Sequence, residues 1–70
     1  MFGERLAQLR KERNLTQAEL AELADIAREQ ISRYERNKQD PDFSTVVCLA
    51  KALEVSVNSL LSGPERNEKV

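Results

Sequence analysis

The sequence predicts an all-α domain, and three observations carry this prediction. Apolar residues recur at helical rather than alternating spacing along almost the whole chain, and β-branched residues concentrate only between Thr45 and Val57. Residues typical of helix starts and helix ends separate the apolar runs. The 70 residues, of which 40% are hydrophobic and 33% charged, have the size and composition of one small globular domain.

The first predicted helix lies at the start of the chain. Its apolar face consists of Phe2, Leu6 and Leu9, with Arg13 in line behind them. Asn14 follows this face and tolerates the left-handed backbone conformation that often ends a helix. We therefore expect the first helix to end there.

The second predicted helix begins at Gln17. Thr16 and Glu19 have the spacing of a capping box, in which the hydroxyl accepts from the Glu19 amide and the carboxylate reaches back to the cap. The helix is short and ends near Asp25. Its narrow apolar stripe contains mostly small residues, which allow another helix to approach closely: Leu20, Ala21, Leu23 and Ala24.

A third helix is predicted from about Arg28, with Ile31 and Tyr34 as its inward residues. The segment 37–41 then breaks the pattern. Asp42 has the position of an N-cap for a fourth helix. The predicted core face of that helix is Phe43, Val46, Leu49, Ala50 and Leu53.

The last predicted helix is capped by Ser56 and runs to Leu61, and Gly63-Pro64 stops it. Residues 64–70 form a charged tail that we expect to fray. The predicted organisation is therefore one domain over residues 1–63 and a short tail.

Composition excludes several classes of protein. With one cysteine, Cys48, the chain has no internal disulfide, and without histidine it has no ligand set for a usual zinc site. A nucleophilic triad would need histidine, so an enzyme is not predicted, and no cofactor is expected. No apolar run reaches the length of a membrane span. We expect a cytoplasmic protein with no membrane partner.

The net charge of −1 does not by itself indicate nucleic acid, but the basic residues are unevenly distributed. Eight of the eleven lie in residues 1–40, where eight acidic residues balance them. A basic face is thus compatible with the sequence: Arg5, Arg10, Lys11, Arg13, Arg28, Arg33, Arg36 and Lys38.

Residues 17–36 meet the physical requirements of a helix-turn-helix, which are two short helices, a tight turn and small residues at the crossing. The segments whose residue types and spacing carry a family resemblance are Arg5-Leu6, Leu9 to Arg13, Leu15 to Ala21, Gln30 to Arg36, Leu49 to Leu53 and Val55 to Val57. Over residues 3–62 the chain resembles the lambda-repressor-like, Cro-type family of helix-turn-helix domains. Two positions depart from that family, since Asp25 stands where glycine is usual and Ala27 where serine or threonine is frequent.

The resemblance implies a compact domain of five helices whose third helix lies in the DNA major groove. A 100° step per residue places the outward side chains of this helix opposite Ile31 and Tyr34. Arginine can bridge O6 and N7 of guanine, and a carboxylate can accept from the N4 amine of cytosine. The predicted base contacts are Arg28, Glu29, Gln30, Ser32 and Arg33.

The same geometry predicts contacts to the DNA backbone. The start of the second helix offers free amide donors and a positive dipole end, and basic residues follow the third helix. These groups would set affinity and register more than sequence preference. The predicted phosphate contacts are Arg10, Thr16, Gln17, Arg36, Asn37 and Lys38.

The predicted function is a prokaryotic or phage transcriptional regulator of repressor type that binds a palindromic operator in double-stranded DNA as a homodimer. The resemblance places the dimer contact near the fifth helix, at Val57, Leu60 and Leu61, although these leucines could instead close the core. An antitoxin-like or other protein-interaction module is the alternative.

Each of these assignments has a structural alternative. The arginines of the third helix could be solvated surface charges, and Glu29 and Glu35 could be ion-pair partners, the latter more readily. Gln17 could serve only to start a helix. Tyr34 is better suited to the core than to stacking on DNA. Cys48 is better explained as an inert, partly exposed thiol than as a redox sensor.

Overall fold

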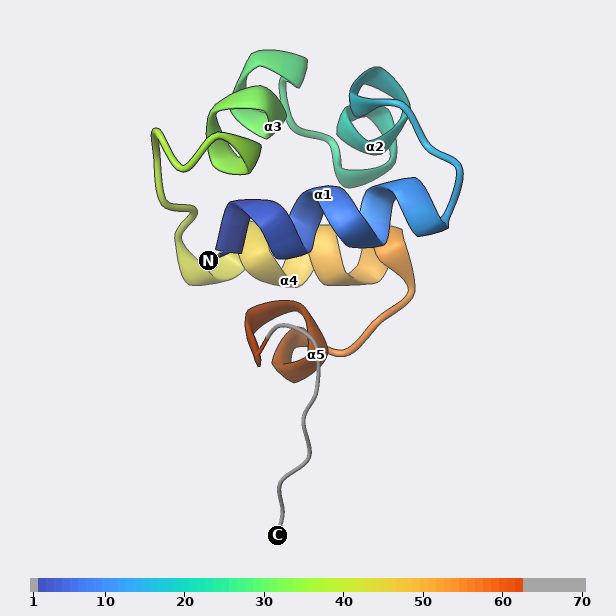
Figure 1. Ribbon diagram of the computed structural model, residues 1–70, viewed down its shortest axis with the longest axis vertical. Coiled ribbons are helices and arrows are strands. Elements are labelled where there is room, and N and C mark those ends of the chain that lie inside the picture. Colours follow the sequence, from blue (N-terminus) through green and yellow to red (C-terminus); the bar gives the residue numbers. More distant parts are fainter. Residues whose placement is uncertain (1, 63–70) are drawn as a thin grey trace, which may run out of the picture.

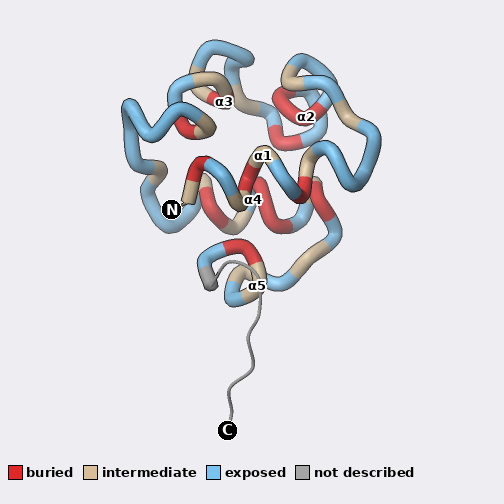
Figure 2. The backbone as a smooth tube through the Cα atoms, in the orientation of Figure 1, coloured by how far each residue is buried: buried red, intermediate tan, exposed pale blue. Residues whose placement is uncertain are grey.

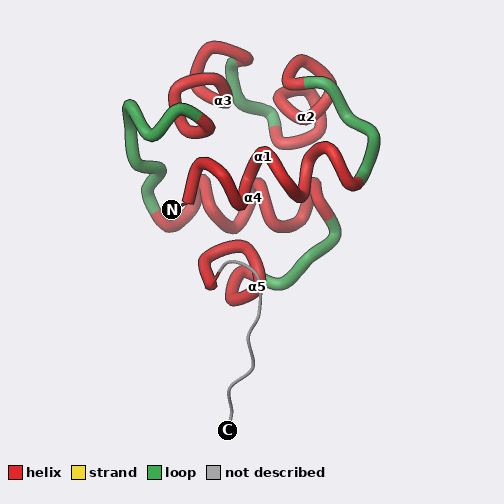
Figure 3. Tube along the Cα trace, viewed as in Figure 1, coloured by secondary structure: helices red, strands yellow, loops and turns green. Residues whose placement is uncertain are grey.

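The structure is a computed structural model that describes residues 2–62, and this part of the chain contains five helices and no strand (Figures 1 and 3). The helices are α1 (Phe2–Glu12), α2 (Gln17–Ala24), α3 (Arg28–Glu35), α4 (Phe43–Leu53) and α5 (Val57–Ser62). The predicted all-α, five-helix fold is confirmed. The predicted stop at Gly63-Pro64 and the tail 64–70 lie outside the described residues. Among the described helices, none is long and apolar enough to cross a membrane.

The helices are arranged around α1 and α4, which cross the middle of the molecule (Figure 1). Helices α2 and α3 pack on one side of this pair, and α5 packs on the other. Helix α3 contacts both α1 and α2, whereas α5 contacts α1 and α4. As a result, α3 and α5 lie at opposite ends of the fold.

One hydrophobic core joins all five helices (Figure 2). The predicted inward residues of α3 are confirmed, since Ile31 is 0% and Tyr34 2% exposed. The core face of α4 is confirmed from Val46 onward. The buried residues are Leu6, Leu9, Leu20, Ala21, Ala24, Ile31, Tyr34, Val46, Leu49, Ala50, Leu53 and Leu60.

Two residues predicted to lie in the core are on the surface. Phe43, the first residue of α4, is 71% exposed, and Leu23 is 59% exposed. A 100° step per residue puts Leu23 at the rim of the buried stripe of α2, away from Ala24. Helical periodicity shows which side a residue faces, but not how far the neighbouring helix extends over it.

The predicted helix starts are confirmed in detail. Thr16 Oγ1 accepts from the Glu19 backbone N–H at 3.0 Å, and the Glu19 carboxylate accepts from the Thr16 N–H at 2.8 Å. Asp42 caps α4 by accepting from the Thr45 N–H at 2.9 Å. Before α5, Ser56 Oγ accepts from the Ser59 N–H at 2.9 Å. These contacts satisfy amides that a helix leaves unpaired at its start.

Helices α1 to α4 are each followed by a residue with left-handed backbone. Their φ angles are 59° at Asn14, 58° at Asp25, 58° at Asn37 and 60° at Glu54. At each, a pair of backbone bonds closes the helix, as where the Asp25 and Ile26 amides donate to Glu22 and Ala21. The predictions for Asn14 and Asp25 are confirmed, and the equivalent ends at Asn37 and Glu54 are new findings.

Candidate nucleic-acid interface

Helices α2 and α3 form a helix-turn-helix joined by the three residues 25–27 (Figure 1). Asp25 turns the chain in the left-handed conformation, and Ala27 stands at the N-cap of α3 in extended conformation without a side-chain hydrogen bond. Both departures from the family pattern are therefore accommodated in the backbone, although α3 begins without a polar cap.

The outward face of α3 carries three exposed, charged side chains. Arg28, Glu29 and Arg33 are exposed, and within residues 2–62 their side chains form no hydrogen bond or ion pair. Gln30 and Ser32 flank them and are half-buried. The structure thus brings the five predicted base-contact residues onto one short helix, with the three charged ones outermost.

Predicted phosphate contacts lie on both sides of this face. Thr16 and Gln17 are at the start of α2, where the first intrahelical bond is donated by the Leu20 N–H, so that the Gln17 and Ala18 amides precede it. Arg36 and Lys38 follow α3 and are exposed. Arg36 is also bonded locally, its Nε donating to the Ser32 carbonyl at 3.3 Å.

An internal polar network ties α1, α2 and α3 together. The Arg10 guanidinium donates to the Glu35 carboxylate through Nε at 2.6 Å and Nη2 at 3.1 Å, and to the Leu15 carbonyl at 2.7 Å. Gln17 Nε2 donates to the same Glu35 carboxylate at 3.0 Å. The side chains of Arg10 and Glu35 are only 12% and 7% exposed.

This network bears on the predicted phosphate contacts of Arg10 and Gln17. Arg10 was predicted to contact a phosphate, but its guanidinium is largely buried and donates to Glu35 and Leu15. The structural interpretation of Glu35 agrees with these contacts. The Gln17 side chain points to Glu35, which leaves its backbone amide as the group available at the surface. Arg10 and Glu35 are 25 positions apart, so local sequence patterns do not reveal this pair.

Asn37, another predicted phosphate contact, reaches across to α1. Its Oδ1 accepts from the Gly3 N–H at 3.0 Å, and its Nδ2 donates to Glu4 Oε1 at 3.2 Å. The residue itself is exposed, but its amide group is used inside the molecule.

The predicted dimer residues of α5 divide between core and surface. Leu60 is 0% exposed and belongs to the core, which agrees with the alternative that this leucine closes the core. Leu61 is 53% exposed and Val57 is half-buried. Arg5 fixes this helix to α1 by donating to the Ser59 carbonyl at 3.1 Å and to its hydroxyl at 3.2 Å.

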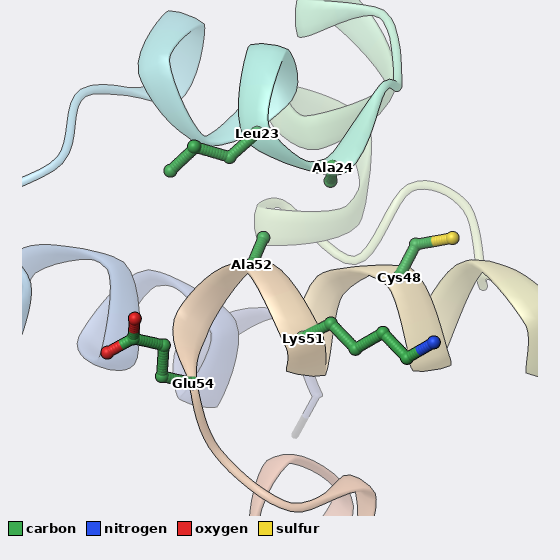
Figure 4. Close-up of a pocket in the computed structure, with 6 residues that line it drawn as sticks. All are labelled: Leu23, Ala24, Cys48, Lys51, Ala52 and Glu54. Carbon is green, nitrogen blue, oxygen red and sulfur yellow. The ribbon is translucent and has the colours of Figure 1, made fainter.

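A shallow groove of about 390 Å³ lies between α2 and α4, away from the polar network of Arg10, Gln17 and Glu35 (Figure 4). Cys48 is exposed there, as predicted. No group of three or more His, Cys, Asp or Glu side chains able to hold a metal ion occurs among the described residues. The groove is lined by Leu23, Ala24, Cys48, Lys51, Ala52 and Glu54.

Comparison with known proteins agrees with this geometry. Residues 6–60 match the model of a helix-turn-helix family. The chain is 42% identical over 64 residues to the HTH-type transcriptional activator BcrR of Enterococcus faecalis, a match that covers 91% of this chain and 31% of BcrR. Similar regulators are also longer, so the chain spans between about a third and three fifths of the length of such relatives.

Two solved structures of protein–DNA complexes have the same fold. The biofilm master regulator SinR in complex with DNA superposes with a TM-score of 0.84 at 40% identity, covering 87% of this chain and 98% of that one. The P22 c2 repressor in complex with a synthetic operator superposes with a TM-score of 0.84 at 33% identity, covering 91% and 97%. The chain belongs to the lambda-repressor-like, Cro-type branch of the helix-turn-helix family.

Proposed function

We propose that this chain is the DNA-binding part of a prokaryotic or phage transcriptional regulator of repressor type, which inserts α3 into the major groove of a palindromic operator. The observation that carries the proposal is the outward face of α3, where Arg28, Glu29 and Arg33 are exposed and their side chains bond to no residue among 2–62. Such side chains are ready to form contacts outside the molecule. The DNA complexes of SinR and the P22 c2 repressor, which share this fold, support the assignment.

Base choice is assigned to the outward face of α3. Arg28, in the first turn, and Arg33, one and a half turns later, each have the fork geometry that bridges O6 and N7 of guanine. Glu29 accepts from a cytosine N4 amine, and it repels phosphates that approach out of register. Gln30 and Ser32 add contacts from the flank.

Affinity and register are assigned to groups around that face. The Thr16 and Gln17 end of α2 presents backbone amides at the positive end of a helix dipole, which suits a phosphate. Arg36 and Lys38 supply positive charge beyond α3. Because Arg10 is bound to Glu35, we assign it to the fold and not to the DNA.

We assign dimerisation to the exposed part of α5, where Leu61 and Val57 continue the apolar surface above the buried Leu60. Because α5 lies at the end of the fold opposite α3, a contact between two α5 helices places the two copies of α3 far apart (Figure 1). This arrangement suits half-sites about one helical turn of DNA apart. The regulator would act in the cytoplasm, on the DNA of the nucleoid.

The test is selection of duplexes from a pool of randomised DNA at about physiological salt. The wild-type chain is compared with Arg28→Ala/Arg33→Ala and with a control, Lys11→Ala/Lys51→Ala, that removes the same charge outside the proposed interface. We expect the wild type and the control to enrich one palindrome and the α3 variant to enrich none.

Sedimentation with the enriched duplex then gives the stoichiometry, which we expect to be two chains per duplex. Two outcomes would overturn the proposal. If folded wild type enriches no sequence, the fold serves another purpose, such as a protein-interaction module. If the α3 variant enriches the same palindrome, α3 does not choose the bases.

A further inference from the structure

The end of α3 is connected to the start of α1 by the side chain of one residue. Asn37 accepts the Gly3 N–H through Oδ1 at 3.0 Å and donates through Nδ2 to Glu4 Oε1 at 3.2 Å. Helix α1 starts at Phe2, so the Gly3 amide is one of those that an α-helix leaves without an internal acceptor. A residue 34 positions away in the sequence thus acts as the cap of α1.

The backbones of the two helices are in close contact at the same place. Gly3 is buried, and a Cβ atom there would lie 2.5 Å from both the Tyr34 and the Glu35 carbonyl oxygens and 2.8 Å from Asn37 Oδ1. Only glycine permits this approach. The positive dipole end of α1 therefore lies against the negative dipole end of α3, which is favourable.

Asn37 is also bound firmly to α3 itself. Its backbone N–H donates to the Tyr34 carbonyl at 3.1 Å, and the next amide, of Lys38, donates to the Arg33 carbonyl at 2.8 Å. This pair of bonds closes the helix around a left-handed residue. Asn37 is thus fixed to α3 through its backbone and to α1 through its side chain.

The negative charge of the Glu4 carboxylate strengthens its hydrogen bond with the Asn37 side chain. A backbone hydrogen bond at Glu4 and the Asn37 side-chain amide lower the pKa of the Glu4 carboxyl. Glu4 is therefore ionised near neutral pH, and hydrogen bonds to an ionised acceptor are stronger than those between neutral groups.

We propose that Asn37 is a positioning residue for DNA recognition, whose amide group bridges Gly3 and Glu4 and so sets the placement of α3 relative to α1. The inference rests on the proposed function, and it replaces a direct contact of Asn37 with phosphate. A positioning residue affects contacts that need accurate geometry, namely those to base edges. A phosphate contact affects binding to every DNA sequence alike.

The first test uses Asn37→Gly, which removes the side chain and keeps a residue that readily adopts positive φ, so that the turn is retained. Gln39→Gly is the matched control, because Gln39 is exposed in the same loop and its side chain bonds to no described residue. Binding is measured to the duplex that the wild type enriches and to a scrambled duplex of equal length.

We expect Asn37→Gly to bind the enriched duplex about tenfold more weakly, because a less accurately placed α3 forms poorer base contacts, and to bind the scrambled duplex as the wild type does. The control should match the wild type on both duplexes. Equal losses on the two duplexes would indicate a direct phosphate contact and overturn the proposal, as would no loss on either.

The second test is rescue. Asn37→Asp keeps the acceptor for Gly3 but sets a carboxylate against that of Glu4, so binding to the enriched duplex should fall. Adding Glu4→Gln supplies an amide donor in place of the repelling charge and returns the net charge to that of the wild type. We expect the double variant to recover the affinity, and a double variant no better than Asn37→Asp would overturn the bridge.

The outcome with the wild type also distinguishes a failure of this inference from a failure of the proposed function. If the wild type enriches no duplex, it is the proposed function that fails. The bridge is then tested by urea denaturation of the same five chains, in which adding Glu4→Gln should restore the midpoint lowered by Asn37→Asp. If the wild type enriches a palindrome and Asn37→Gly binds it equally well, only the positioning role fails.

Discussion

The outward and inward sides of α3 hold their side chains in opposite ways. Along the outward face from the first turn, Arg28, Glu29 and Arg33 have no side-chain partner within residues 2–62. At the last turn Glu35 binds Arg10 and Gln17, and just beyond it Asn37 binds the start of α1. A recognition residue must be free to meet its partner, whereas a helix must be fixed to present it accurately. On this eight-residue helix the two tasks fall to different sides, since the exposed Arg33 and the bound Glu35 lie in the same last turn.

The largest expected effect is on the inward side of α3. Glu35→Ala leaves the Arg10 guanidinium, only 12% exposed, without its carboxylate, and should cost about 3–5 kcal/mol of unfolding free energy. The control is Glu54→Ala, which breaks an exposed pair with Arg13 and should cost no more than about 1 kcal/mol. Urea denaturation measures both, and similar losses in the two variants would contradict the distinction. Glu35→Gln, which keeps the bulk, serves if Glu35→Ala does not fold.

Variants on the outward side of α3 should behave in the reverse way, losing DNA affinity and keeping their stability. Arg33→Ala removes an exposed side chain without described partners, so its unfolding free energy should stay within about 0.5 kcal/mol of the wild type. Its affinity for the enriched duplex should fall by about 1–3 kcal/mol, which corresponds to about 5- to 150-fold. Urea denaturation and DNA titration of the same preparation measure the two quantities. A large loss of stability with unchanged binding would reverse the assignment.

The missing cap of α3 gives a smaller effect. Ala27 stands at the N-cap without a side-chain hydrogen bond, and Ala27→Ser adds a hydroxyl that can accept from an amide of the first turn. The expected gain in stability is about 1 kcal/mol. Thermal and urea denaturation would measure it, with Ala18→Ser inside α2 as a control that should show no gain. A gain in the control as large as that in Ala27→Ser would remove the capping explanation.

The smallest expected effect is on the pH dependence of stability, at Asp42, which lies outside the proposed DNA interface. Hydrogen bonds from the Thr45 side chain and backbone N–H lower the pKa of the Asp42 carboxyl. A lowered pKa stabilises the fold above the usual titration range of the group and loses that contribution as pH falls through the folded-state value. Asp42→Asn should therefore lose less stability than the wild type between about pH 6 and pH 3. Equal losses in urea denaturation at the two pH values would count against this cap.

The helices were predictable because their starts and ends depend on neighbours in the sequence. The capping box at Thr16 and Glu19 and the caps at Asp42 and Ser56 each involve residues three apart. The outward face of α3 was predictable for the same reason, since helical geometry fixes it once Ile31 and Tyr34 are inward.

The remaining features depend on contacts between distant segments. The bonds of Arg10 to Glu35 and of Asn37 to Gly3 join residues 25 and 34 positions apart. Side-chain groups that were expected at phosphates are therefore bound to other parts of the chain. The exposure of Leu23 and the burial of Leu60 depend on how far neighbouring helices extend, which periodicity does not give. A glycine in the first turn of a helix, Gly3, was the one local sign of the close approach between α1 and α3.

The most direct test of the division between the two sides of α3 is a base-pair scan. Every single-base-pair variant of the enriched duplex is titrated with wild type, Arg33→Ala and Asn37→Gly. We predict that Arg33→Ala abolishes discrimination at one position in each half-site, whereas Asn37→Gly weakens binding and keeps the order of preference at every position. A new preference in Asn37→Gly, or a uniform loss in Arg33→Ala, would contradict the separation of recognition from positioning.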